Sequence, residues 1–244
     1  MQNKLISIGR VSQRLGVSID TLRRWDRSGR LKATRTSPHS HRYYLQSDLN
    51  EFLQEIDAIG KKWAEEPFGS RPQSEYYCET RDIFQARLEA LQSKLTHVAH
   101  VEKVSLVTAV AGEIGNNSFD HNLGNWPDVP GVFFTYSLRE RKVVLADRGL
   151  GILATLKRVR PQLTNSEEAL KVAFTETISG RYPETRGNGL KFVRSIIVKY
   201  PFTLYFQTGN ASLYLKENDI DINVEKSKTP IRGCFVIIGF EDLI

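Results

Sequence analysis

The chain has 244 residues, of which 40% are hydrophobic and 25% are charged, and its formal net charge is +6. This composition suits one or two globular domains with a hydrophobic core and argues against wholesale disorder. The sequence contains no run of about 18 apolar residues, which argues against a membrane-spanning helix. The N-terminal segment lacks a secretory signal pattern and the two cysteines, Cys78 and Cys234, form no pairing or metal motif, so we expect a cytoplasmic protein.

The positive charge is concentrated near the N-terminus. Residues 1–62 carry 12 Lys and Arg against 6 Asp and Glu, whereas residues 63–244 carry 22 of each. A basic region on a neutral body suggests a polyanion-binding module fused to a second unit, and the alternative is a solvated basic face. We expect a basic domain over 1–57, a linker containing Gly, Pro and Ser over 58–78, and a larger domain over 79–244.

The basic region begins with two predicted short helices. Ile8, Val11 and Leu15 share one face of the first helix, which Gly16 ends. Ser18 is predicted to cap the second helix, because its side-chain oxygen can accept a hydrogen bond from a backbone N–H of the first turn. Two short helices joined at a Gly-containing turn predict a helix-turn-helix.

The second helix, IDTLRRWDRSG, is predicted to bury Ile19, Leu22 and Trp25. It is expected to expose polar side chains: Asp20, Thr21, Arg23, Arg24 and Arg27.

Two extended segments follow, separated by a turn at Ser37–Pro38, and they predict a two-stranded wing. Four basic side chains lie in or beside it: Arg35, His39, His41 and Arg42. Ser47 is expected to cap a third helix over 48–57.

The run from Ile8 to Leu31, followed by Arg35-Thr36 and His41-Arg42-Tyr43-Tyr44, resembles the DNA-binding domain of the MerR family. It also resembles the short N-terminal domains of transposon-type serine recombinases and excisionases. The resemblance implies double-stranded DNA as a partner. The DNA-contacting residues implied are Ser18, Thr21, Arg23, Arg24, Arg35, His41 and Arg42.

The larger domain alternates helical and strand patterns. Apolar spacing predicts helices over 80–96, 102–121, 166–174 and 189–199. Residues 131–147 predict two strands joined by a charged turn, FTLYFQTGNASLYLK predicts a hairpin around Gly209–Asn210, and RGCFVIIGF predicts a final strand. This alternation favours an α+β fold, with helices on one face of a mostly antiparallel sheet.

Three polar motifs stand out in this domain. Glu113, Asn117 and His121 are four residues apart, which places them on one face of the helix over 102–121. Asp147 ends an apolar strand and is followed by two glycines in DRGLG, where the backbone can approach a ligand closely. The segment RGNGL leads into a helix, and a Gly-rich loop at a helix N-terminus is suited to anions.

In this order, the motifs resemble the ATP-binding domain of gyrase, Hsp90, histidine kinases and MutL (the GHKL superfamily, a Bergerat-type α/β sandwich) over 95–242. EIGNNSFDH is similar to its N box, DRGLG to its first glycine box and RGNGL to its second. The resemblance implies ATP and Mg²⁺ as ligands, with Asn117 on Mg²⁺, Asp147 on the adenine amino group and Glu113 as the catalytic base. It also implies a lid over 152–186. The ATP-contacting residues implied are Asn117, His121, Asp147, Gly149, Gly151, Arg186, Gly187, Gly189 and Leu190.

Three functions are compatible with these patterns. The first is an ATP-responsive DNA-binding regulator that acts as a homodimer on paired half-sites. The second is an anti-sigma-type kinase that phosphorylates Ser or Thr on a partner with a STAS-like fold. The third is a DNA-stimulated ATPase of a mobile element. A self-phosphorylating histidine kinase is disfavoured, because His97 and His100 lack the acidic neighbour and proline of the phosphoacceptor pattern.

Overall fold

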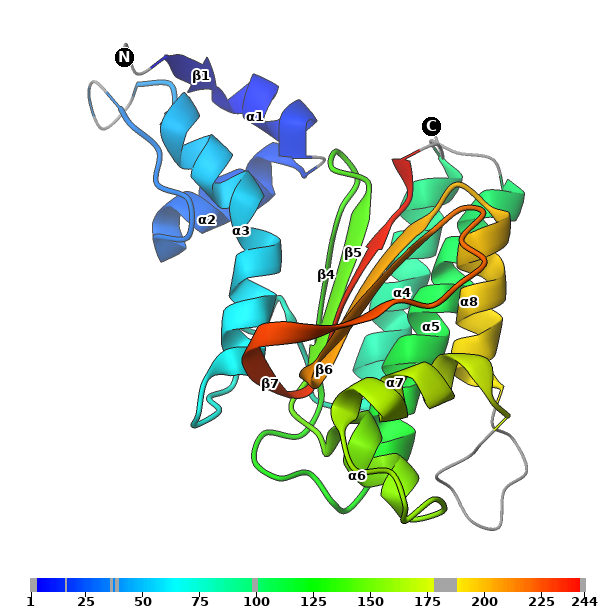
Figure 1. Ribbon diagram of the computed structural model, residues 1–244. Coiled ribbons are helices and arrows are strands. Elements are labelled where there is room, and N and C mark those ends of the chain that lie inside the picture. Colours follow the sequence, from blue (N-terminus) through cyan, green and yellow to red (C-terminus); the bar gives the residue numbers. More distant parts are fainter. Residues whose placement is uncertain are drawn as a thin grey trace. The chain divides into compact units, whose positions relative to one another are not determined.

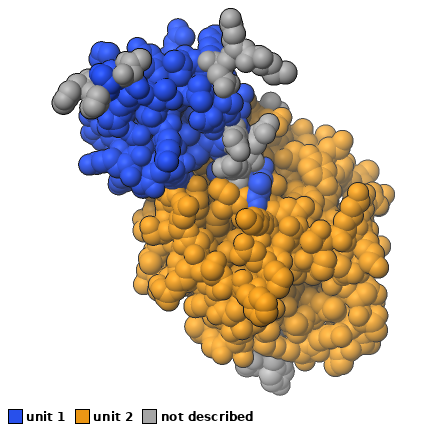
Figure 2. All heavy atoms as spheres, turned by 90° about the vertical axis from the view of Figure 1, so that its left-hand side faces the viewer, with its two compact units in different colours: residues 1–58, 137–140 blue, residues 59–136, 141–244 orange. Residues whose placement is uncertain are grey.

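The computed structural model of the chain describes residues 4–15, 17–35, 37, 40–97, 101–177 and 188–241. These residues belong to two compact units, which Figure 2 colours separately. Unit 1 comprises residues 1–58 with 137–140, and unit 2 comprises residues 59–136 with 141–244.

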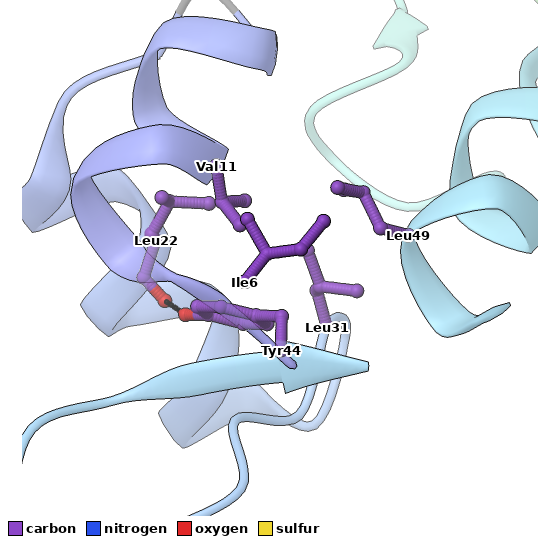
Figure 3. Close-up of a cluster of buried hydrophobic side chains, with 6 residues drawn as sticks. All are labelled: Ile6, Val11, Leu22, Leu31, Tyr44 and Leu49. Atoms are coloured by element: carbon purple, nitrogen blue, oxygen red, sulfur yellow. Dashed lines mark hydrogen bonds between the residues drawn. The ribbon is translucent and has the colours of Figure 1, made fainter. Parts of the chain in front are cut away.

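Unit 1 is small and contains helices and a two-stranded sheet. Its elements are β1 (Leu5–Ser7), α1 (Ile8–Leu15), α2 (Ile19–Ser28), β2 (Tyr43–Leu45) and the first part of α3 (Gln46–Glu65). Its core consists of six buried side chains: Ile6, Val11, Leu22, Leu31, Tyr44 and Leu49 (Figure 3). The Tyr44 hydroxyl donates a hydrogen bond of 3.3 Å to the Leu22 carbonyl, which satisfies the buried phenol.

Helix α2 begins and ends at capping residues. Ser18 accepts a hydrogen bond of 3.1 Å from the Thr21 N–H, and Gly29 ends the helix in the left-handed conformation with φ of +77°. Leu22 is fully buried, and Trp25 packs against the same core. Ile19 is 39% exposed, so the prediction that it is buried was wrong; core contacts of this helix begin one turn later, at Leu22.

Strand β2 pairs with β1, which the sequence patterns did not predict. In this antiparallel pair Ile6 lies opposite Tyr44, and both side chains are buried, which explains why the N-terminal segment takes this position. Thr34 and Tyr43 form an isolated antiparallel bridge with hydrogen bonds of 2.7 and 3.0 Å. Within the described residues, the expected two-stranded wing is therefore this bridge; Pro38 and His39 lie outside them.

Helix α3 runs without interruption from Gln46 to Glu65, well beyond the predicted end at residue 57. Ser47 does not cap it, because Ser47 lies inside the helix and its hydroxyl donates to Asp48 at 2.9 Å. The residues before 59 belong to unit 1 and those from 59 onward to unit 2, so one helix is shared by both units.

Unit 2 is built on a five-stranded sheet in the order β3-β4-β5-β7-β6. Its strands are β3 (Tyr77–Cys78), β4 (Val132–Ser137), β5 (Lys142–Asp147), β6 (Thr203–Lys216) and β7 (Val224–Gly239). Its helices are α4 (Arg81–Thr96), α5 (Val101–Asn122), α6 (Gly151–Lys157), α7 (Ser166–Thr175) and α8 (Gly189–Lys199). The α+β fold class is confirmed.

The two faces of this sheet are covered differently. Helices α4, α5 and α8 lie side by side against one face (Figure 1). Phe134 points to this face and contacts Phe84 of α4 edge-on, with ring centroids 5.3 Å apart. Its neighbour Phe133 points to the opposite face and packs on Tyr76 and on Trp63 of α3, at 5.1 and 6.2 Å. The last turns of α3 are thus part of the unit 2 core.

The predicted hairpin around Gly209–Asn210 was wrong. Strand β6 continues through these residues, and the chain reverses instead between Lys216 and Val224. Gly209 has a φ of +54° and accompanies shifts of register between β6 and β7. Its positive φ serves a β-bulge, a conformation that a sequence pattern does not distinguish from a turn.

None of the helices in the described part of the chain is long and apolar enough to cross a membrane.

Candidate functional site

Asp147 lies at the end of β5 with its side chain only 3% exposed. It accepts hydrogen bonds of 2.8 Å from the Ser118 hydroxyl of α5 and from the Gly149 N–H of the DRGLG loop. Burial raises the pKa of Asp147, and the hydrogen bonds from Ser118 and Gly149 offset this only in part. A carboxyl group at this position therefore joins α5, β5 and the glycine loop.

Glu113 and Asn117 form a second part of the site, one turn apart on α5. The Asn117 amide donates a hydrogen bond of 3.0 Å to Glu113 Oε1. The first residue of α8, Gly189, lies directly against this pair, because a methyl group added at Gly189 would be 1.9 Å from Glu113 Oε1. A larger residue at this position would have to displace the Glu113 carboxylate. The structure thus brings the start of α8, with its half-buried Leu190, to a carboxylate and an amide.

Two buried polar residues of α5 were missed by the sequence reasoning. Ser118 holds Asp147, and Asn122 accepts a hydrogen bond of 2.8 Å from the Leu150 N–H while donating 2.7 Å to the Ser118 carbonyl. A methyl group at Gly149 would be 2.1 Å from Asn122 Nδ2, so the loop is packed tightly on α5. Ser118 and Asn122 are four residues apart and therefore share a helix face, next to the face of Asn117 and His121. This spacing is the sequence signal that could have identified them.

Thr208 of β6 is a third residue that the patterns did not indicate. Its hydroxyl donates 2.9 Å to the Gly233 carbonyl of β7 and accepts 3.2 Å from the Ile152 N–H. Gly151, with φ of +75°, lies beside it. The start of α6 is therefore fixed to the edge strand β6, level with Asp147. Isolated threonines in strands carry no sequence signal for such a role.

The other predicted residues are distributed as follows. His121 is half-buried in the last turn of α5, where its neighbour Asn122 makes the contact with the glycine loop. Arg186 and Gly187 lie outside the described residues. Among the residues that the structure describes, no group of three or more His, Cys, Asp or Glu could hold a metal ion by itself.

In unit 1, α2 presents a polar face. Arg23 and Arg24 are exposed, and Arg23 pairs at 2.9 Å with the exposed Asp20. Thr21 is half-buried and its hydroxyl lies 3.0 Å from that of Ser18. Ser18 is thus occupied as the helix cap, and the arginines remain open to solvent.

Asp26 organises the segment that follows α2. Its carboxylate accepts 2.8 Å from Arg42, 3.1 Å from the Ala33 N–H and a further short bond from Arg35. Burial by itself would raise the pKa of Asp26, but the bonds from Arg42, Ala33 and Arg35 outweigh it and lower the pKa. Two of the arginines predicted to contact DNA are therefore held in place by one acid, while His41 is exposed.

This arrangement of two short helices, the second capped at both ends, and an arginine-bearing connection matches a known family. Residues 7–44 match the model of the MerR family regulatory protein. The segment is a MerR-family DNA-binding domain.

The matched residues of the MerR-family domain run from the end of β1 to the middle of β2, and they include the whole of α1 and α2. They contain every residue for which we predict a DNA contact. The domain accounts for a DNA-binding regulatory role of unit 1. Unit 2 lies outside this match.

A second similarity is short. A stretch of 66 residues is 35% identical to the Type II methyltransferase M.Eco47II of Escherichia coli, which is 27% of this chain and 16% of that protein. Since the chain spans about a sixth of that relative, the similarity shows nothing about methyl transfer here.

Proposed function

We propose that this chain is an ATP-responsive DNA-binding regulator, in which unit 2 binds Mg–ATP and thereby changes the DNA affinity of the MerR-family domain. The observation that carries the nucleotide part is the packing of Gly189 against Glu113 and Asn117 of α5, the helix whose Ser118 binds the buried Asp147. A carboxylate, an amide, a strand-end acid and a glycine-led helix N-terminus are brought together from segments far apart in the sequence. The resemblance of 95–242 to the GHKL superfamily supports the same assignment.

The residues present fit a magnesium–triphosphate ligand. Mg²⁺ keeps several waters and takes only one or two protein oxygens together with phosphates, so the absence of a larger ligand cluster among the described residues is compatible with it. Asn117 would hold the ion, and the first-turn N–H groups of α8, an eleven-residue helix, have no partner within the helix and suit phosphate oxygens. When bound, the ion would neutralise charge on the phosphates.

The surroundings of Asp147, Glu113 and the two glycines of the loop support a role for each of them. Asp147 would accept a hydrogen bond from an exocyclic amine, as its position at the strand end between α5 and the glycine loop allows. Glu113, adjacent to Asn117, would orient water or a hydroxyl group near the terminal phosphate. Gly149 and Gly151 would form the pocket wall, because their lack of side chains lets the loop pack closely on Asn122 of α5 and on Thr208 of β6.

On the DNA side, the exposed Arg23 and Arg24 of α2 would face the major groove and contact phosphates at its edge, and Arg35, Arg42 and His41 would contact further phosphates. A single domain of this size contacts few base pairs, so we propose a homodimer on paired half-sites. Coupling requires that the DNA-competent and incompetent states differ in ATP affinity.

The test measures nucleotide and DNA binding in the same chain. A duplex selected from a random-sequence library serves as the DNA probe, and its affinity is measured with and without saturating Mg–ATP. We expect ATP to change DNA affinity about fivefold or more. Asp147→Asn should lose ATP binding and keep the DNA affinity of the ATP-free protein. Equal DNA affinity with and without bound ATP, or an unchanged ATP affinity of the variant, would overturn the proposal. Product analysis of the same samples separates binding from hydrolysis.

A further inference from the structure

Arg148, the second residue of DRGLG, has a fully buried side chain with 0% exposure. It follows Asp147 directly, and its contacts lie on the side of the sheet opposite to α5. Its guanidinium binds the Asp128 carboxylate through Nη2 at 2.7 Å and through Nε at 3.1 Å. Such a buried cation needs a specific structural reason, because burial of a charge is unfavourable unless it is fully hydrogen-bonded.

The remaining donors of Arg148 go to the end of α3. Nη1 donates to the Trp63 carbonyl in a short hydrogen bond, and Nη2 donates 2.8 Å to the Glu66 carbonyl. The guanidinium also lies over the Trp63 ring, 5.9 Å from its centroid. A helix C-terminus has unpaired carbonyls and a partial negative charge. A guanidinium there donates hydrogen bonds to the carbonyls and its positive charge interacts favourably with the helix dipole. Arg148 therefore caps α3 from within the glycine loop.

The other end of helix α3 is packed into the core of unit 1. Leu49, in its first turn, is fully buried in the core of unit 1 with Leu22 of the DNA-binding helix α2. The helix is continuous from Gln46 to Glu65. A displacement of the Arg148 guanidinium would act on a helix whose first turn belongs to the core of the MerR-family domain.

We propose that Arg148 is the residue that transmits the state of the glycine loop to α3, and through α3 to the DNA-binding domain. The proposal rests on the proposed function for the identity of the signal, Mg–ATP. Asp147 and Arg148 share one peptide unit, so a ligand that moves Asp147 or Gly149 also moves the base of the guanidinium. By linkage, DNA binding would change nucleotide affinity by the same factor.

The test compares Arg148→Lys with Arg232→Gln. Lysine keeps the charge but cannot serve the carboxylate and two carbonyls at once. Arg232 is a matched control, because it lies 3.8 Å from the same Asp128 carboxylate and is 42% exposed. Circular dichroism and thermal unfolding establish that both variants are folded, and Asp128→Asn, which weakens the same contact from the other side, is the second variant if Arg148→Lys does not fold.

In the wild type, saturating Mg–ATP should change amide hydrogen exchange at residues 59–66 and change DNA affinity about fivefold or more. In Arg148→Lys, ATP and DNA should each bind within about threefold of wild type, but both effects of ATP should fall to less than twofold. Arg232→Gln should behave as wild type. An Arg148→Lys chain that keeps the full ATP effect on residues 59–66 would refute the proposal.

A perturbation without nucleotide separates this inference from the proposed function. Gly149→Ala must shift the loop or the Asn122 side chain that binds the Leu150 N–H of the loop, because the added methyl group would be 2.1 Å from Asn122 Nδ2. It should alter exchange at 59–66 when Arg148 is present and leave these residues unchanged in Arg148→Lys. If the wild type does not bind ATP, the proposed function fails while this double-mutant comparison still decides the role of Arg148. If Gly149→Ala alters residues 59–66 equally in both backgrounds, or in neither, Arg148 does not transmit the loop's state.

Discussion

Asp26 offers the sharpest prediction for the MerR-family domain. Its side chain is 9% exposed and binds Arg42, Arg35 and the Ala33 N–H. In Asp26→Asn, the amide oxygen still accepts from Ala33, but the ionised acceptor of both arginines is lost. We therefore expect the domain to lose stability without losing its core.

The magnitude follows from these contacts. Hydrogen bonds to charged groups contribute about 1.5–3 kcal/mol each. The side chains of Arg42 and Arg35 are 23% and 29% exposed, so solvent screens both interactions. We expect Asp26→Asn to lower the free energy of unfolding by about 2 kcal/mol at neutral pH.

The sign of the pH dependence follows from the lowered pKa of Asp26, in which the bonds from Arg42, Ala33 and Arg35 outweigh the opposing effect of burial. A carboxyl group whose pKa is lower in the folded than in the unfolded state stabilises the fold above its ordinary pKa. That stabilisation disappears as the pH falls through the lowered value. The difference between wild type and Asp26→Asn should therefore be full at neutral pH and vanish in acid.

Urea unfolding followed by Trp25 fluorescence measures this difference in a full-length chain whose Trp63 and Trp126 are replaced by Phe. Asp20→Asn is the control, since Asp20 also binds an arginine, Arg23, but its side chain is 85% exposed. We expect the control to change the free energy of unfolding by about 0.5 kcal/mol or less. Two results would refute this account of Asp26: equal losses of unfolding free energy in Asp26→Asn and Asp20→Asn, or a difference between wild type and Asp26→Asn that stays the same in acid.

Three further predictions concern the DNA interface, the buried acid and the core. Arg23→Ala with Arg24→Ala should weaken DNA binding and lower the slope of log affinity against log salt by about 2, measured by fluorescence anisotropy in a salt series; an unchanged slope contradicts phosphate contacts. Burial raises the pKa of Asp147, so the folded state is destabilised as the pH rises above the ordinary pKa of an aspartate and the buried carboxyl group must ionise. In thermal unfolding, the melting temperature of Asp147→Asn should therefore fall less than that of the wild type over this pH range. Gly115→Ala should destabilise unit 2 by about 1–3 kcal/mol in urea unfolding, because its methyl group would lie 2.1 Å from Phe84 Cζ; an unaffected midpoint would mean that Phe84 yields freely.

Local patterns predicted most of the regular elements. The caps of α2 at Ser18 and Gly29 and the bounds of α8 at Gly189–Lys199 follow from residue chemistry within a few positions of the chain. The α+β class follows from the same patterns. In each of these cases the favourable interaction is made between residues close in sequence, so the sequence itself displays both partners.

The predictions that were wrong or missing concern interactions between residues far apart in the sequence. Strand β1, the reach of α3 to Glu65 and the continuity of β6 through Gly209 all depend on partners distant in sequence: Tyr44, Phe133 and β7. Asn122 and Arg148 are comparable cases at the site. The spacing of Glu113, Asn117 and Asp147 in the sequence indicated a site. The roles of Asn122 and Arg148 could not be predicted in this way, because their partners are brought close only when the glycine loop packs on α5 and on the end of α3.

The amino-acid sequence by itself therefore determined the DNA-binding helices, the class of fold and the polar motifs of unit 2. The tertiary structure alone decided which of those motifs meet, and that the loop carrying Asp147 is tied by a buried arginine to the helix shared with unit 1. The physical reason is that a buried charge or amide is stable only where its hydrogen-bonding partners converge, and that convergence is a property of the packed chain.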